Sequence, residues 1–136
     1  MISVSQTYAY PFKFSQADVV AFANVTGDKN PIHVDEAFAA TTIFKRSIMH
    51  GMLSASVFSS VFGTLFPGEG TIYLKQSLDF LKPMYVDTDY LAEFTIKEII
   101  KNKNRAIVET IIKQKTATEV VCISGEALIM NKAIIT

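Results

Sequence analysis

The feature that most constrains the fold is an apolar segment in the middle of the chain, from His50 to Leu65. Wound as a helix, its apolar residues fall almost all the way round the axis, and small serines fill the gaps. A helix that is apolar on every side belongs inside a protein rather than on its surface. We therefore expect a buried central helix, ended by the turn from Pro67 to Gly70, with the remaining chain wrapped around it.

The C-terminal half supplies the structure that would wrap this helix. Strands are predicted over residues 72–81, 90–100, 106–115 and 120–130. Apolar and polar residues alternate along the later segments, and short turns near 102–104 and 116–118 separate them. Such period-two patterning with hairpin-like turns is typical of an antiparallel sheet. The sequence thus predicts an α+β protein with a hot-dog fold, in which an antiparallel sheet wraps around a long buried central helix.

The N-terminal region predicts shorter elements. Residues 8–14 favour a short strand. Ser15 and Asp18 have the spacing of a capping box, so a helix should begin there and end at Gly27. Asp35 can cap another short helix that runs to residue 40. No linker or repeat interrupts the chain, and its 136 residues fit a single domain over 1–136.

Composition excludes several classes of function. The formal net charge is zero, which argues against a nucleic-acid-binding surface. The apolar stretch from Met52 to Phe66 is too short and too rich in hydroxyls to span a membrane, and the N-terminus does not resemble a signal peptide. We therefore expect a cytoplasmic protein.

The single cysteine, Cys122, permits no intramolecular disulfide and is expected to be a small buried residue. Hydrophobic residues make up 49% of the chain, which suits a protein that buries a partner surface or an acyl ligand.

The first candidate for chemistry is the segment from Thr26 to His33, which holds Asp28 and His33 five positions apart. Pro31 fixes its own φ and restricts the residue before it, so this loop is stiff. A carboxylate and an imidazole on a stiff loop can grip one water molecule and exchange protons with it near neutral pH. The alternative is an ordinary turn, because Gly-Asp and Asn-Pro are common in loops.

The second candidate is the pair His50-Gly51 at the start of the apolar helix. The N–H of Gly51 would be one of the unpaired donors of the first turn, at the positive end of the helix dipole. Without a Cβ, glycine also lets a ligand carbonyl approach the backbone, which suits a developing oxyanion. The alternative is a helix that simply starts at a permissive glycine. No spacing typical of a metal site occurs around the two histidines, so no metal is expected.

Taken together, these segments resemble the signature of the MaoC-like (R)-specific enoyl-CoA hydratases, known as the hydratase 2 family. The similarity covers nearly the whole chain, and its motifs keep the family's order and spacing. The matching segments are residues 27–33 (GDKNPIH), 37–40, 48–53 (IMHGML), 72–80 and 125–127. The chain is especially similar to the short, single-hot-dog bacterial members that supply (R)-3-hydroxyacyl-CoA for polyhydroxyalkanoate synthesis.

The resemblance implies a role for each matching residue. Asp28 and His33 would be the catalytic pair, and the sequence leaves open which of them is the formal base. Gly51 would donate its N–H to the thioester oxygen, Asn30 would hold the loop, and Ser59 would line the active site. The family adds water in syn fashion across a trans-2-enoyl-CoA, with no metal or redox cofactor. It usually works as a homodimer, with the acyl tunnel near the interface.

The resemblance also predicts where the acyl chain lies. Ser59, Phe62 and Leu128 should lie along the acyl pocket. Ser59 and Phe62 are three positions apart on the helix and would share one side of it, and the strand carrying Leu128 could pack beside them. A bulky Phe62 would close the pocket, so we expect a preference for short acyl chains. The alternative is that Phe62 is an ordinary core residue.

Three competing functions remain open at this level. One is a dehydratase that acts on acyl-carrier-protein substrates. Another is a hot-dog thioesterase, which usually carries an acidic residue on the central helix, whereas residues 52–65 contain no Asp or Glu. The third is a non-catalytic module that binds acyl-CoA, which the presence of both Asp28 and His33 disfavours.

Overall fold

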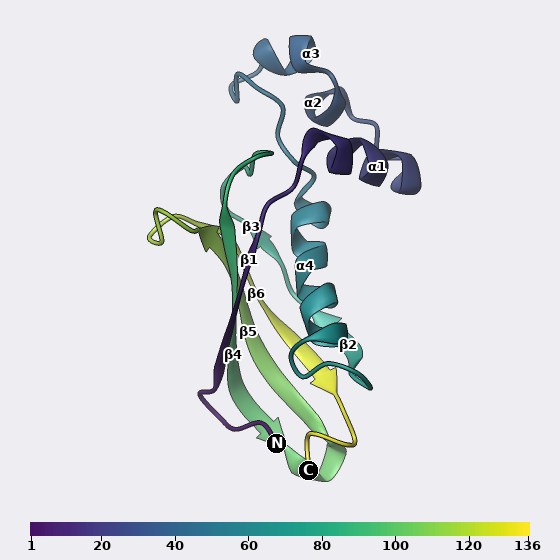
Figure 1. The fold of residues 1–136 in the computed structure, drawn as a ribbon, viewed down its shortest axis with the longest axis vertical. Coiled ribbons are helices and arrows are strands. Elements are labelled where there is room, and N and C mark those ends of the chain that lie inside the picture. Colours follow the sequence, from purple (N-terminus) through teal and green to yellow (C-terminus); the bar gives the residue numbers. More distant parts are fainter.

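A computed structural model of the chain describes residues 1–136 and shows an antiparallel sheet curved against one long helix (Figure 1). The sheet runs in the order β1-β4-β5-β6-β2, and the short β3 also pairs with β6. Its strands are β1 (Thr7–Phe12), β2 (Ile72–Gln76), β3 (Asp79–Phe80), β4 (Tyr90–Ile100), β5 (Arg105–Gln114) and β6 (Val121–Met130). The predicted α+β hot-dog fold is therefore confirmed.

The central helix, α4 (Gly51–Thr64), presses one face against the sheet. Phe58 and Phe62 from this face both pack edge-on against Phe94 of β4. The opposite face, which carries Met52 and most of the serines, is exposed. The expectation of a helix buried on every side is thus wrong for a single chain, because the sheet covers only one side of α4.

Three short helices lie beyond one end of the sheet, around the start of α4 (Figure 1). They are α1 (Gln16–Thr26), α2 (Pro31–Val34) and α3 (Glu36–Ala40). The predicted capping box is present with both of its hydrogen bonds, and Gly27 ends α1 in the left-handed conformation, with φ of 81°. Asp35 caps α3 as predicted. The single helical turn α2 was not predicted.

The predicted strand over residues 72–81 is divided into β2 and β3. The break occurs at Ser77, which lies beside β6 and whose N–H donates to the carbonyl oxygen of Glu126, 2.9 Å away. A Cβ on Gly125 would lie only 1.9 Å from the carbonyl oxygen of Ser77, so only glycine permits this close approach. The remaining strands match the predicted segments closely, and the short 3₁₀ turn η1 (Lys101–Lys103) joins β4 to β5.

The core lies between α4 and the concave face of the sheet. Inward-facing residues of the strands, such as Phe94, Val108 and Ile129, are fully buried there. Cys122 belongs to the same core, as predicted, and burial raises the pKa of its thiol. None of the helices has the length and apolar character needed to cross a membrane.

Candidate active site

A cavity of about 470 Å³ opens at the N-terminal end of α4, between the segment that carries Asp28 and His33 and the residues that follow β3. Asp28, His33 and Gly51, three residues predicted to act in catalysis, all line it. Most of its other walls are apolar and come from residues 44–52 and 80–84. The structure therefore brings the two candidate motifs of the sequence together at one hollow.

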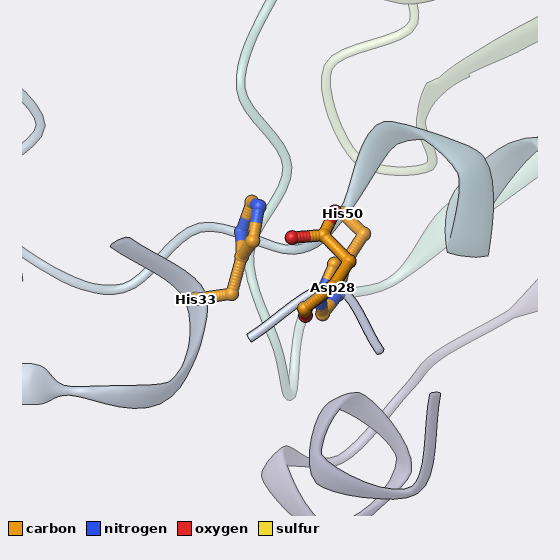
Figure 2. A group of neighbouring side chains, drawn as sticks. All are labelled: Asp28, His33 and His50. Atoms are coloured by element: carbon orange, nitrogen blue, oxygen red, sulfur yellow. The ribbon is translucent and has the colours of Figure 1, made fainter. Parts of the chain in front are cut away.

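Asp28 lies just after α1, on the loop whose direction Gly27 sets. Its N–H donates to Oγ1 of Thr26 at 3.1 Å, and its Oδ1 accepts the N–H of Asn30 at 3.3 Å. Figure 2 shows the carboxylate directed toward the ring of His33. A carboxylate oxygen of Asp28 and one ring nitrogen each from His33 and His50 lie within 4.8 Å of one another. The carboxylate is thus held at a distance from the imidazole that a single small molecule could bridge.

His33 sits on α2 with its ring orientation fixed by the backbone. Its Nδ1 lies 2.7 Å from the carbonyl oxygen of Ile48. A carbonyl can only accept, so Nδ1 carries the proton, and Nε2 of the neutral ring is left with a free lone pair. The carbonyl oxygen of His33 itself accepts a hydrogen bond from Nε2 of Gln16 at 3.1 Å. These contacts make Nε2 the atom of this ring that is available for proton transfer.

His50 completes the cluster and is only 2% exposed. Its Nε2 lies 2.9 Å from the backbone carbonyl oxygen of Asp28. Its ring packs against that of His33, with centroids 4.0 Å apart and planes inclined by 31°, and the ring of Phe22 packs against it at a centroid distance of 4.9 Å. The sequence singled out His50 as the neighbour of Gly51 and as a weak candidate for a metal ligand. Its burial and its bond to Asp28 depend on the tertiary structure.

The cluster has the groups that proton transfer requires. One nitrogen of each imidazole is engaged with a backbone carbonyl, which leaves the other nitrogen of each ring free. A carboxylate beside an imidazole with one free nitrogen is equipped to take a proton from water and return it.

Gly51 is the first residue of α4, and its N–H belongs to the first turn, where no intrahelical acceptor is available. A Cβ at this position would lie 2.6 Å from Cε1 of Phe80. Glycine therefore lets the Phe80 ring close over the start of the helix beside an N–H at the positive end of the helix dipole. Such an N–H can stabilise an oxyanion.

The residues predicted to contact the substrate lie elsewhere. Asn30 is exposed and caps α2, with its Oδ1 accepting the N–H of Ile32 at 3.3 Å. Ser59 lies on the exposed face of α4, and Phe62 is 1% exposed between Tyr73 and Phe94. None of these residues lines the cavity.

Leu128 lies on the strand that was predicted to pack beside the helix, but its side chain is not part of that core. Its neighbours on β6, Ala127 and Ile129, are the buried, inward-facing residues, so the alternation of the strand turns Leu128 to the other face. There it lines a separate hollow of about 250 Å³ together with Ile107 and Lys75. The strand was predicted correctly, and the role of Leu128 in the acyl pocket stays a prediction.

Comparisons with known proteins place this site in context. Residues 3–120 match the model of the MaoC like domain. The chain is 41% identical over 128 residues to the (R)-specific enoyl-CoA hydratase of Aeromonas caviae, covering 94% of each protein. It is 38% identical over 132 residues to the enzyme of the same name from Rhodospirillum rubrum, covering 97% of this chain and 90% of that protein. The solved structure of the A. caviae (R)-hydratase, described as involved in PHA biosynthesis, superposes with a TM-score of 0.90 at 40% identity and covers 96% of this chain and 97% of that one.

Proposed function

The chain belongs to the MaoC-like family, and from this membership we propose that it is an (R)-specific enoyl-CoA hydratase, a hydro-lyase that converts trans-2-enoyl-CoA to (R)-3-hydroxyacyl-CoA or catalyses the reverse. The observation that carries the proposal is the meeting of Asp28, His33 and Gly51 at one cavity. A carboxylate, an imidazole and a helix-start N–H are the groups that this reaction requires.

The chemistry follows from what each group can do. Water held by Asp28 and His33 attacks C3 of the enoyl thioester, and the pair takes up the proton that the water loses. The C2–C3 double bond becomes a single bond as charge moves to the thioester oxygen, where the N–H of Gly51 stabilises it. C2 then receives a proton from the same pair. Because the same pair makes both proton transfers, from water and to C2, on one face of the substrate, the addition is syn.

The enzyme is proposed to act as a homodimer. Strand β2 lies at an edge of the sheet, and its Ile72 and Leu74 are 50% and 39% exposed. The exposed face of α4 includes Met52, at 58%. An open sheet edge with exposed apolar side chains is a surface on which another copy can pair. Sedimentation velocity at micromolar concentration tests this, and a monomer alone would contradict it.

A dimer would also give Ser59 a place near the substrate. In the single chain Ser59 lies on the exposed face of α4, outside the cavity. A second copy packed on that face would cover it, so the substrate role proposed for Ser59 depends on the dimer. The same argument does not extend to Phe62, which the sheet already buries.

Crotonyl-CoA provides the direct test of the activity. Loss of enoyl absorbance in the presence of the purified protein, with (R)-3-hydroxybutyryl-CoA as the product, is the expected result. A parallel assay with the crotonyl group on an acyl carrier protein separates the hydratase from the carrier-protein dehydratase. Release of free CoA would instead indicate a thioesterase, which α4 disfavours because it contains no acidic residue. Tight binding without turnover would indicate a non-catalytic module.

A further inference from the structure

His50 connects the two halves of the proposed active site. The loop that carries Asp28 and the helix that begins at Gly51 come from different parts of the chain. The ring of His50 spans them, since its backbone adjoins Gly51 and its Nε2 bonds the carbonyl oxygen of Asp28 at 2.9 Å. This side-chain hydrogen bond therefore links the loop that carries Asp28 to the start of α4.

His50 occupies a position where its side chain would normally stabilise α4, but its hydrogen bond does not do so. His50 is the N-cap residue of α4 and makes no side-chain capping bond to it. Ser, Thr, Asp or Asn would stabilise the helix better at an N-cap, typically by about 1 kcal/mol relative to a residue that cannot cap. The histidine instead reaches away from its own helix to hold the backbone of the Asp28 loop.

The same bond fixes the tautomer of the ring. Because the partner of Nε2 is a carbonyl, Nε2 carries the proton and Nδ1 is a pure acceptor. Nδ1 has no partner within the chain, and neither does Oγ of the fully buried Ser54, on the next turn of α4. Both residues line the cavity. His50 therefore has two separable features, a donor that holds Asp28 and an acceptor, Nδ1, that has no partner within the chain.

We propose that His50 is a positioning residue for hydration, whose Nε2–H bond to the Asp28 carbonyl sets the separation between the water-holding pair and the N–H of Gly51. The inference rests on the proposed function and extends it to a residue that does not itself exchange protons with the substrate. The water must reach C3 while the thioester oxygen rests on Gly51, so both must be in place at once. A displacement of about 1 Å between such groups can reduce turnover by about 100-fold.

Three substitutions separate the features of His50. In His50→Gln the amide nitrogen lies where Nε2 was, so the donor to Asp28 is kept. In His50→Asn the shorter amide can place an acceptor where Nδ1 was, but it cannot reach the carbonyl oxygen of Asp28 with a donor. His50→Phe keeps an aromatic ring against His33 and Phe22 and loses both polar features.

The measurements are kcat for crotonyl-CoA and the Kd of butyryl-CoA, which lacks the double bond and cannot be hydrated. We expect His50→Gln to keep kcat within about threefold of the original protein, while His50→Asn and His50→Phe lose about 10- to 100-fold. The Kd of butyryl-CoA should change by less than about twofold in all three, because the N–H of Gly51 is untouched. A purely structural role would lower the melting temperature without this separation of kcat from Kd.

Several results would overturn the inference. One is a normal kcat in His50→Phe, or in His50→Asn if the Phe variant does not fold. Another is retention of kcat in His50→Asn with loss in His50→Gln, which would assign the effect to Nδ1 rather than to the bond with Asp28. Absence of hydration by the unmodified protein would instead reject the proposed function itself, so the two failures are distinguishable.

Discussion

Replacing Phe62 by alanine decides whether this residue closes the acyl pocket or belongs to the core. The family resemblance implied that Phe62 closes the acyl pocket, and the alternative was that Phe62 is an ordinary core residue. In the structure its side chain is 1% exposed and outside the cavity. It packs edge-on against Tyr73 and Phe94, with ring centroids 5.3 and 5.2 Å away. We therefore expect Phe62→Ala to reduce stability and to leave the preference for acyl chain length unchanged.

The magnitude follows from what the ring contacts. Removing a buried phenylalanine typically costs about 3–5 kcal/mol, and each edge-to-face partner adds about 0.5–1.5 kcal/mol to a simple burial term. With two such partners, we expect a loss of about 4–5 kcal/mol. Unfolding entropy scales with length and is roughly 0.3 kcal/mol/K for 136 residues, so Tm should fall by about 14–17 °C.

Calorimetry gives Tm, and kcat/KM for crotonyl-CoA and octenoyl-CoA gives the chain-length preference. Ser60→Ala is the matched control, because Ser60 lies two residues earlier on the exposed face of the same helix. Its stability should change by no more than about 0.5 kcal/mol. If Phe62→Ala lowers Tm by less than about 3 °C and raises the relative activity on octenoyl-CoA, the assignment of Phe62 to the core is wrong.

The remaining predictions concern the site and the buried thiol. Asp28→Asn and His33→Gln should each lower kcat for crotonyl-CoA by at least about 100-fold, while circular dichroism shows an intact fold; a folded double variant with normal turnover would refute the mechanism. Gly51→Ala should lower kcat and the melting temperature, because its Cβ would lie 2.6 Å from the Phe80 ring and displace that exposed side chain from the start of α4. Adding Phe80→Ala should restore normal melting, and full recovery of kcat in the double variant would show that the clash alone was responsible. Burial raises the pKa of Cys122, so its thiol should react with an aromatic disulfide reagent at pH 8 only after denaturation, and rapid labelling of the native protein would contradict the buried placement.

Local features were predictable wherever neighbouring residues decide the structure. The capping box at Ser15 and Asp18, the left-handed Gly27 and the Asp35 cap depend on hydrogen bonds over three or four residues, and all are present. The alternation along β4, β5 and β6 predicted the antiparallel sheet, because one face of each strand must be buried. The spacing of Asp28 and His33 likewise suggested a proton-transfer pair.

Placement across the fold was less predictable. The face of Leu128 could not be predicted, because residues 127–130 are all apolar and alternation there does not show which side of β6 is buried. Ser59 and Phe62 are close in sequence, yet the sheet buries one and leaves the other exposed. Helical spacing alone shows that residues share a side, but not how far the neighbouring layer extends.

The sequence by itself determined the element types, the fold class and the two segments that carry the chemistry, because these depend on periodicity and on contacts between near neighbours. Only the tertiary structure decided which groups meet. The bond from His50 to the carbonyl of Asp28 joins residues 22 positions apart, and the bond from His33 to the carbonyl of Ile48 joins residues 15 apart. No local pattern encodes such pairs, because each forms only when the packing of the short helices against the start of α4 brings its two partners together.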